Sequence, residues 1–236
     1  MPQINLEIPI FSPSSASSAL SHGATRLELN APGSYPAGGL TPPLSALASL
    51  LSSSSSSRSL PIDAMLASIR HFKASGLLDP SRGDGFVFGI LRPSSSSSSA
   101  AVVLDSDANA RLVTEAKPFG CTFTAPSTPS SPDHIDALLA CGFDAVLTSG
   151  GPGNASDNLA RLGDLIRAAA GRLDVLIGGG VRASGAAALL EAAGAANRVW
   201  LHSSCIGAGE TDEVDAGEVA ALVEVIGEAV LGSKQG

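Results

Sequence analysis

The chain of 236 residues has few aromatic side chains, which make up 4% of it. Hydrophobic residues nevertheless account for 44% of the sequence. A core of this composition must be built from Ala, Val, Leu and Ile, which suits helices packed on a sheet.

Cations and long apolar runs are also scarce. The chain has 14 Lys and Arg against 22 Asp and Glu, which gives a net charge of −8, and no run of Lys or Arg occurs. This balance lacks the electrostatic footprint of nucleic-acid binding. No apolar stretch reaches the roughly 18 residues of a membrane span, and residues 1–10 do not resemble a signal peptide. We therefore expect no nucleic-acid partner, no membrane partner and no export.

The three cysteines, Cys121, Cys141 and Cys205, are odd in number and widely spaced. This spacing argues against a disulfide framework and favours a reducing compartment, the cytoplasm. Thiolates are ligands that select Cu(I), but the sequence has no CxxC or CxC pair that would form a thiolate site by itself.

A recurring phrase predicts the fold: a helical segment, then glycine, then a short strand of branched apolar residues. Gly23 precedes the strand 26–29, and Gly142 precedes the strand 145–148. The glycine can end a helix in the left-handed conformation, so that the strand can enter a sheet at once. Helix and strand in alternation are typical of parallel βαβ units.

This pattern predicts an α/β fold of the TIM type, a single (β/α)-barrel domain over residues 1–236. The length fits, since such barrels typically need about 250 residues and tolerate about 200. Seven strands are clear, and they are expected at Ile4–Ile8, Arg26–Leu29, Phe86–Ile90, Cys121–Phe123, Ala145–Thr148, Val175–Gly178 and Val199–His202. An open doubly wound sheet is the alternative, although the glycine-rich loops follow several strands rather than one switch point.

The missing strand would be the third. Between the helix expected near Pro43–Leu51 and the helix expected near Ile62–Ser75 lies a segment that is mostly serine. The low-complexity segments 52–59 and 94–99 cannot bury enough apolar area to offset their ordering, so we expect both to be loops. A barrel that fails to close would leave a sheet edge that invites homodimerisation or aggregation.

Alternation along the first two strands places polar residues on one face. Glu7 shares a face with Asn5, and Arg26 shares one with Glu28 and Asn30. These side chains are expected to face the barrel interior, either as a structural ion-paired layer or as groups that position a substrate or a water. Glu7 and Glu28 are the candidate general acids or bases.

Small residues follow three later strands, where a TIM-type barrel usually binds phosphate. The predicted anion-binding residues are Ser149, Gly150, Gly178, Gly179, Gly180 and Ser203. The alternative is that the glycines only permit tight turns. His202, at the end of the last strand, could be an acid, a base, a metal ligand or simply hydrogen-bonded in place.

Several motifs resemble those of the CutC copper homeostasis family, and the resemblance extends from about Ile4 to Ser204. The residues that carry it are Leu6-Glu7-Ile8, Arg26-Leu27-Glu28-Leu29, Gly38-Gly39-Leu40-Thr41-Pro42, Gly85-Phe86-Val87-Phe88-Gly89, the run from Gly142 to Gly151 and Gly178-Gly179-Gly180-Val181. The resemblance implies a TIM-type barrel, a cytoplasmic location and an association with copper handling.

The sequence departs from the family pattern at several places. Pro9 and Asn30 stand near positions where family members carry cysteine, Thr124-Ala125 replaces a His-Arg pair, and the basic third strand is missing. Two hypotheses explain the missing strand: divergence of this chain, or a gene model that lost a coding segment. An uninterrupted transcript that matches this sequence would exclude the second.

Three functions follow as hypotheses. The first is cytoplasmic copper homeostasis with weak or indirect copper ion binding, for which the candidate metal ligands are Cys121, Cys205 and His202. The second is a barrel enzyme that acts on a small phosphorylated or carboxylated metabolite. The third is a non-catalytic scaffold.

Overall fold

The computed structural model describes residues 4–42, 62–94, 102–125, 133–194, 196, 198–207 and 213–232. The first serine-rich segment, residues 95–99 of the second and the helix expected near Pro43–Leu51 lie outside these residues.

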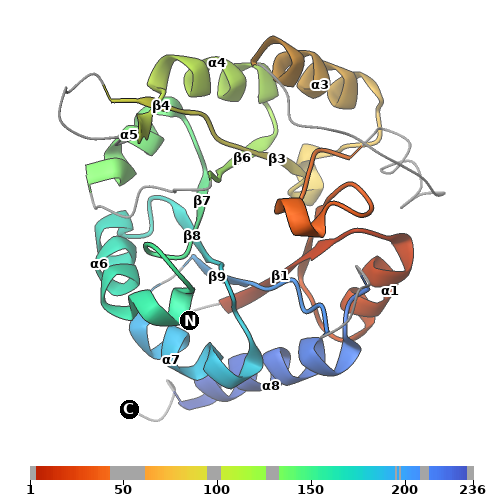
Figure 1. Ribbon diagram of the computed structural model, residues 1–236, viewed down its shortest axis with the longest axis vertical. Coiled ribbons are helices and arrows are strands. Elements are labelled where there is room, and N and C mark those ends of the chain that lie inside the picture. Colours follow the sequence, from red (N-terminus) through yellow and green to blue (C-terminus); the bar gives the residue numbers. More distant parts are fainter. Residues whose placement is uncertain are drawn as a thin grey trace.

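The centre of the molecule is a parallel sheet of seven strands (Figure 1). They are β1 (Ile4–Ile10), β2 (Arg26–Leu29), β3 (Gly85–Phe88), β6 (Gly120–Phe123), β7 (Ala145–Thr148), β8 (Asp174–Ile177) and β9 (Val199–His202). Their order is β2-β1-β9-β8-β7-β6-β3, so neighbours in the chain are neighbours around a curled sheet. This order lacks the reversal of a doubly wound sheet and confirms the barrel-type α/β prediction.

The curl is incomplete at the predicted place. The two outermost strands of the sheet in the described part of the chain are β2 and β3, between which the third barrel strand was missing from the sequence pattern. The helix α3 (Ile62–Ala74) nevertheless packs beside α4 (Ser106–Ala116). The helix that should follow a third strand is therefore present.

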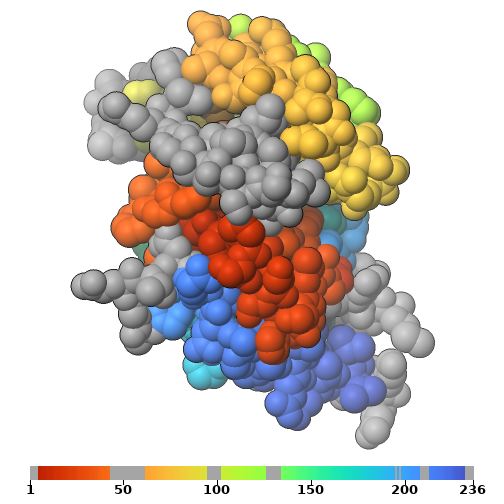
Figure 2. Space-filling model, turned by 90° about the vertical axis from the view of Figure 1, so that its right-hand side faces the viewer, coloured from red at the N-terminus to blue at the C-terminus, as the bar shows by residue number. Residues whose placement is uncertain are grey.

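Helices surround the sheet on its outer side (Figure 1). Besides α3 and α4 they are α1 (Pro13–Ser21), α5 (Asp133–Cys141), α6 (Leu159–Ala169), α7 (Ala183–Ala193) and α8 (Ala216–Gly232), with short 3₁₀ turns η1 (Tyr35–Ala37), η2 (Pro80–Arg82) and η3 (Ala155–Asn158). Figure 2 shows α1, in red, beside the blue C-terminal helix α8 on the same face of the molecule. None of the helices in the described ranges has the length and hydropathy needed to cross a membrane.

Helix α1 shows how sequence positions these elements. Ser12 is its N-cap, with extended backbone and a side chain that accepts a hydrogen bond from the Ser15 amide, and Pro13 occupies the first turn. A proline there loses no helical hydrogen bond, and the serine satisfies an amide that would otherwise lack a partner.

A small hairpin was not predicted. Strands β4 (Leu91–Pro93) and β5 (Val102–Leu104) pair antiparallel between β3 and α4. Each has three residues, which is too short for an alternating pattern to be recognised. This hairpin matters for function because Val102 reaches the cavity described below.

The core lies between the sheet and the helices. The residues that alternate with the polar interior positions are fully buried, among them Ile8, Val146, Ile177 and Leu201 at 0% exposure. The core is mainly aliphatic, as composition led us to expect, but it also contains Phe88, Phe123 and Phe143, whose rings contact one another. The opposite face of the strands can carry polar side chains.

Candidate functional site

Strand register brings the polar residues of β1, β2 and β9 together. Glu7 is opposite Arg26 on one side and opposite His202 on the other. Glu28 is opposite Pro9, two positions nearer to the C-terminal ends of the strands. The predicted interior layer therefore forms at the end of the barrel where active sites of this fold lie.

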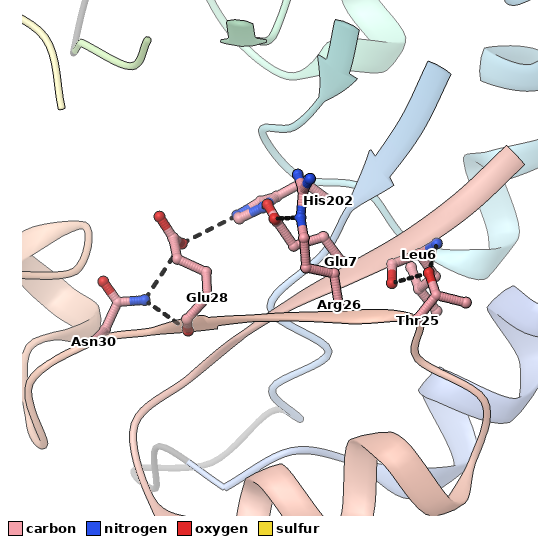
Figure 3. A network of polar contacts seen from close by, with 7 residues as sticks. All are labelled: Leu6, Glu7, Thr25, Arg26, Glu28, Asn30 and His202. Atoms are coloured by element: carbon pink, nitrogen blue, oxygen red, sulfur yellow. Dashed lines mark hydrogen bonds and ion pairs between the residues drawn. The ribbon is translucent and has the colours of Figure 1, made fainter. Parts of the chain in front are cut away.

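Glu7 is the centre of this layer (Figure 3). Its Oε1 lies 2.7 Å from His202 Nδ1, and its Oε2 accepts a hydrogen bond from Arg26 Nε. Arg26 also stacks over Trp200, with its guanidinium carbon 4.0 Å from the ring centroid. Both carboxylate oxygens of Glu7 are thus engaged, and the ring of His202 is fixed in orientation.

Glu28 lies on the other side of the histidine. Its Oε2 is 3.8 Å from His202 Nε2 and accepts a hydrogen bond of 3.3 Å from Asn30 Nδ2 (Figure 3). Asn30 stands where the resemblance led us to expect cysteine, and here it orients a carboxyl group. The result is a chain of three groups, Glu7, His202 and Glu28.

The two carboxyl groups have opposite electrostatic surroundings. Burial raises the pKa of Glu28 above 4.5, and the charge of Glu7 adds to this, while His202, Asn30 and Arg26 oppose it only in part. Burial would also raise the pKa of Glu7, but the hydrogen bonds and charges of His202 and Arg26 lower it below 4.5. Glu7 is therefore held ionised, and Glu28 is the carboxyl group that retains a proton more readily.

The surroundings of His202 favour its charged form. Burial acts to lower its pKa, but the hydrogen bond to Glu7 and the negative charges of Glu28 and Glu7 raise it above 6.5. A protonated imidazole beside a carboxyl group of raised pKa can give and take protons near neutral pH.

A cavity of about 930 Å³ opens above this layer. Glu28 and His202 line it, whereas Glu7 does not. Its wall runs from β2 across the ends of β9, β8 and β7 to β6, where it includes Thr124 and Ala125. The cavity is large enough for a small metabolite.

The glycine-rich loops also reach the cavity, and close packing explains part of their composition. Gly179 and Gly180 have positive φ, at +92° and +69°. A methyl group added at Gly180 would lie 2.5 Å from Asn154 Oδ1, and one at Gly179 would lie 2.9 Å from Ser149 Cβ. The structure thus favours the turn interpretation for these glycines, although both also line the cavity.

The predicted serines are used within the loops. The Ser149 hydroxyl donates to the Gly151 carbonyl at 2.6 Å, and the Ser203 hydroxyl donates to the Val181 carbonyl at 2.7 Å. Neither hydroxyl hydrogen is left for an anion. Gly150 has a positive φ of +78°, and its amide donates to Thr148 Oγ1. These three residues therefore shape the loops.

Two residues that line the cavity were not predicted as site residues from the sequence. Arg182 lies two residues after Gly180, and His134 lies in the first turn of α5; both line the cavity. Within the described part of the chain, Arg182 Nη1 and His134 Nδ1 are buried without a hydrogen-bond partner. The only signal for Arg182 was its place as a cation shortly after a glycine loop and before a helix.

The candidate metal ligands are not brought together. All three cysteines are free and buried. Burial raises the pKa of Cys121 to about 12 and that of Cys205 to about 11. The described residues contain no group of three or more His, Cys, Asp or Glu side chains that could hold a metal ion. Cys121, Cys205 and His202 therefore do not form one site, and the residues present do not fit a preformed copper centre.

The fold and the site together define a (β/α)-barrel protein with a polar site at the C-terminal ends of its strands. The family model of the CutC family matches residues 4–207, and the chain belongs to this family. A CutC protein of Porphyromonas gingivalis is 32% identical over 195 residues, which cover 76% of this chain and 73% of that protein. One of Sinorhizobium medicae is 29% identical over 87% of this chain and 82% of its own length.

Solved structures agree on the fold. A CutC protein of Streptococcus agalactiae, named for copper homeostasis, is similar with a TM-score of 0.65 at 19% identity over 85% of this chain and 98% of that one. Phosphoribosyl anthranilate isomerase of Thermus thermophilus is similar with a TM-score of 0.57 at 13% identity over 95% of this chain and 99% of that one. At these identities the likeness concerns architecture only.

Proposed function

We propose that this protein is an enzyme that binds a small anionic metabolite, phosphorylated or carboxylated, in the cavity and transfers a proton to or from it. The observation that carries the proposal is the chain Glu7–His202–Glu28 below the cavity. In it, the pKa of one carboxyl group is lowered and the pKa of the other is raised. Pairs of titratable groups whose surroundings separate their pKa values are typical of acid–base sites.

The roles follow from the contacts. Glu28 and His202 line the cavity and are the proposed catalytic residues. Glu7 forms a hydrogen bond with His202 Nδ1 and does not line the cavity, so it is a positioning residue. It orients the imidazole ring with Nε2 facing Glu28. Such proton transfer typically contributes about 10²–10⁴-fold to a rate.

The local charge favours an anion. Glu7 and Arg26 neutralise each other, His202 carries a positive charge when it is protonated, and the pKa of Glu28 is shifted in favour of its neutral form. Arg182 adds a positive charge and has no carboxylate within 4.0 Å among the described residues. These groups suit the cavity to an anion, in a chain whose net charge is −8.

Ligand-dependent melting tests this proposal. The chain is melted with a panel of phosphorylated and carboxylated metabolites, and compounds that raise Tm are then tested as substrates with the natural chain and with Glu28→Gln. We expect at least one compound to raise Tm and to be converted, and Glu28→Gln to retain binding but lose about 10²-fold or more in kcat. No Tm shift with any compound would contradict the proposal.

Copper homeostasis is the second candidate function, and it is supported by membership of the CutC family. Because the described residues do not fit a preformed copper site, the role proposed here is weak copper ion binding or an indirect one, in the cytoplasm. An anaerobic Cu(I) titration against a competing chelator tests it. Saturable binding that is weakened in Cys121→Ser, Cys205→Ser or His202→Gln supports direct copper binding. No binding by the folded chain contradicts direct copper binding.

A further inference from the structure

The side chain of Arg182 is held at the cavity wall by one half of its guanidinium group. Arg182 is the N-cap residue of α7 and has an extended backbone, with φ −139° and ψ 156°. Its Nη2 donates to the Ile206 carbonyl at 2.9 Å, which ties the end of the β8–α7 loop to the segment after β9. This contact fixes the position of the guanidinium plane.

The other terminal nitrogen of the guanidinium group, Nη1, has no hydrogen-bond partner among the described residues. Arg182 Nη1 is also buried. A buried charged donor without an acceptor is costly to a protein, so such a donor calls for an explanation. Arg26 Nη2 is also buried without a partner among the described residues, but the Nε of Arg26 pairs with Glu7, whereas no carboxylate pairs with Arg182 in the described part of the chain.

The surroundings of Arg182 at the cavity wall suit an anion. The amides of Gly179 and Gly180 belong to the loop directly before Arg182, and no acceptor for them is found among the described residues. His202 lies on the neighbouring strand β9 and lines the same cavity, and its contact with Glu7 favours the protonated ring. A planar guanidinium beside backbone amides is suited to a phosphate or carboxylate group.

We propose that Arg182 recognises the anionic group of the cavity's ligand. The ligand is then a small molecule that places a phosphate or carboxylate against Arg182 and its reacting atom against Glu28 and His202. This inference rests on the proposed function, because it names the residue that selects the ligand of the same cavity. It makes Arg182 a specificity-determining residue rather than only a link to Ile206.

Calorimetric titration with inorganic phosphate and, separately, with acetate tests this assignment and distinguishes the two anion chemistries. The proteins compared are the natural chain, Arg182→Gln, Arg182→Lys and the control Arg167→Gln, whose arginine is exposed and pairs with Asp164 on the outer helix α6. Melting without ligand shows whether each variant is folded, because Arg182→Gln also loses the bond to Ile206.

We expect at least one anion to bind the natural chain and Arg167→Gln equally. Arg182→Gln should weaken that binding about tenfold or more, and Arg182→Lys should recover part of it. Should the natural chain bind an anion and Arg182→Gln bind it equally well, the role of Arg182 is overturned while the proposed function stands. Failure of the natural chain to bind either anion overturns this inference, whereas the metabolite panel alone decides the proposed function.

Discussion

At the scale of single residues, Glu7 is a buried carboxylate whose charge is compensated by two partners. Its side chain is 5% exposed and is satisfied by Arg26 and His202, which are 28% and 13% exposed. Removing one partner of a buried charged pair leaves the other charges uncompensated.

We therefore predict that Glu7→Gln lowers the free energy of unfolding by about 3 kcal/mol at neutral pH. Urea unfolding measures this. The matched control is Glu115→Gln, which breaks the exposed pair with Arg70 and should cost less than about 1 kcal/mol. Equal losses in the two variants would show that the interior layer does not stabilise the fold.

Glu28 gives a prediction of opposite sign. Its pKa in the folded state is raised above 4.5, so folding favours its neutral form, and stability is lost as the pH rises through the folded pKa. The Glu28→Gln variant should be as stable as the natural chain at about pH 4 and more stable than the natural chain at about pH 8. Unfolding at several pH values, with the exposed Glu228→Gln as control, measures the difference. A difference that does not grow with pH would refute the assignment.

Sequence alone could place Glu7, Arg26, Glu28 and His202 in the interior, because strand alternation has a period of two. It could not decide which carboxyl group keeps its proton. That depends on register, which puts Glu7 and not Glu28 between a cation and an imidazole. Nor could it reveal that Arg182 Nη1 lacks a hydrogen bond to any described residue, because the contact that fixes the guanidinium group, with Ile206, joins distant segments.

At the scale of elements, the loop after β8 requires a glycine at position 180. Gly180 has φ +69°, and an added methyl group would lie 2.5 Å from Asn154 Oδ1, across the interface with the loop after β7. Gly185, five residues later in α7, has no atom within 4 Å of such a methyl group.

We predict that Gly180→Ala destabilises the protein by about 1–3 kcal/mol, because it combines backbone strain with a clash. Gly185→Ala should instead stabilise it by up to about 1 kcal/mol through helix propensity. Chemical denaturation of both variants checks the pair. If the two alanines had the same effect, close packing between the loops would not explain the glycine at position 180.

Element prediction succeeded where the pattern was long enough. The strands at 26–29, 145–148 and 199–202 were predicted to the residue, since a glycine and a polar turn bound each of them. The other four strands were found with boundaries displaced by up to two residues. The β4–β5 hairpin was missed because each strand has only three residues.

At the scale of the whole molecule, the incomplete sheet has consequences for association. The Phe88 carbonyl accepts from the Thr124 amide, so the backbone groups of Phe88 face β6 and those of Val87 face the side of β3 that pairs with no strand in the described part of the chain. Val87 is also 39% exposed. An unpaired strand of this kind invites pairing with a second chain.

We predict that the natural chain self-associates at high concentration and that Val87→Lys reduces this, because lysine on an edge strand opposes pairing. Leu20→Lys, at a 53% exposed position on α1, is the control. Light scattering after size exclusion measures the mass. A natural chain that stays monomeric at every concentration would rule out association through this edge.

The histidine at the centre of the site allows the most direct test of the account. The chain has four histidines, so the ring nitrogens of His202 can be followed by NMR of ¹⁵N-histidine-labelled protein as the pH is varied. Because the pKa of His202 is raised above 6.5 by its contact with Glu7, we predict that it stays protonated above that pH and that Glu7→Gln lowers its pKa. Titration at or below 6.5 that is unchanged in Glu7→Gln would contradict the acid–base site proposed here.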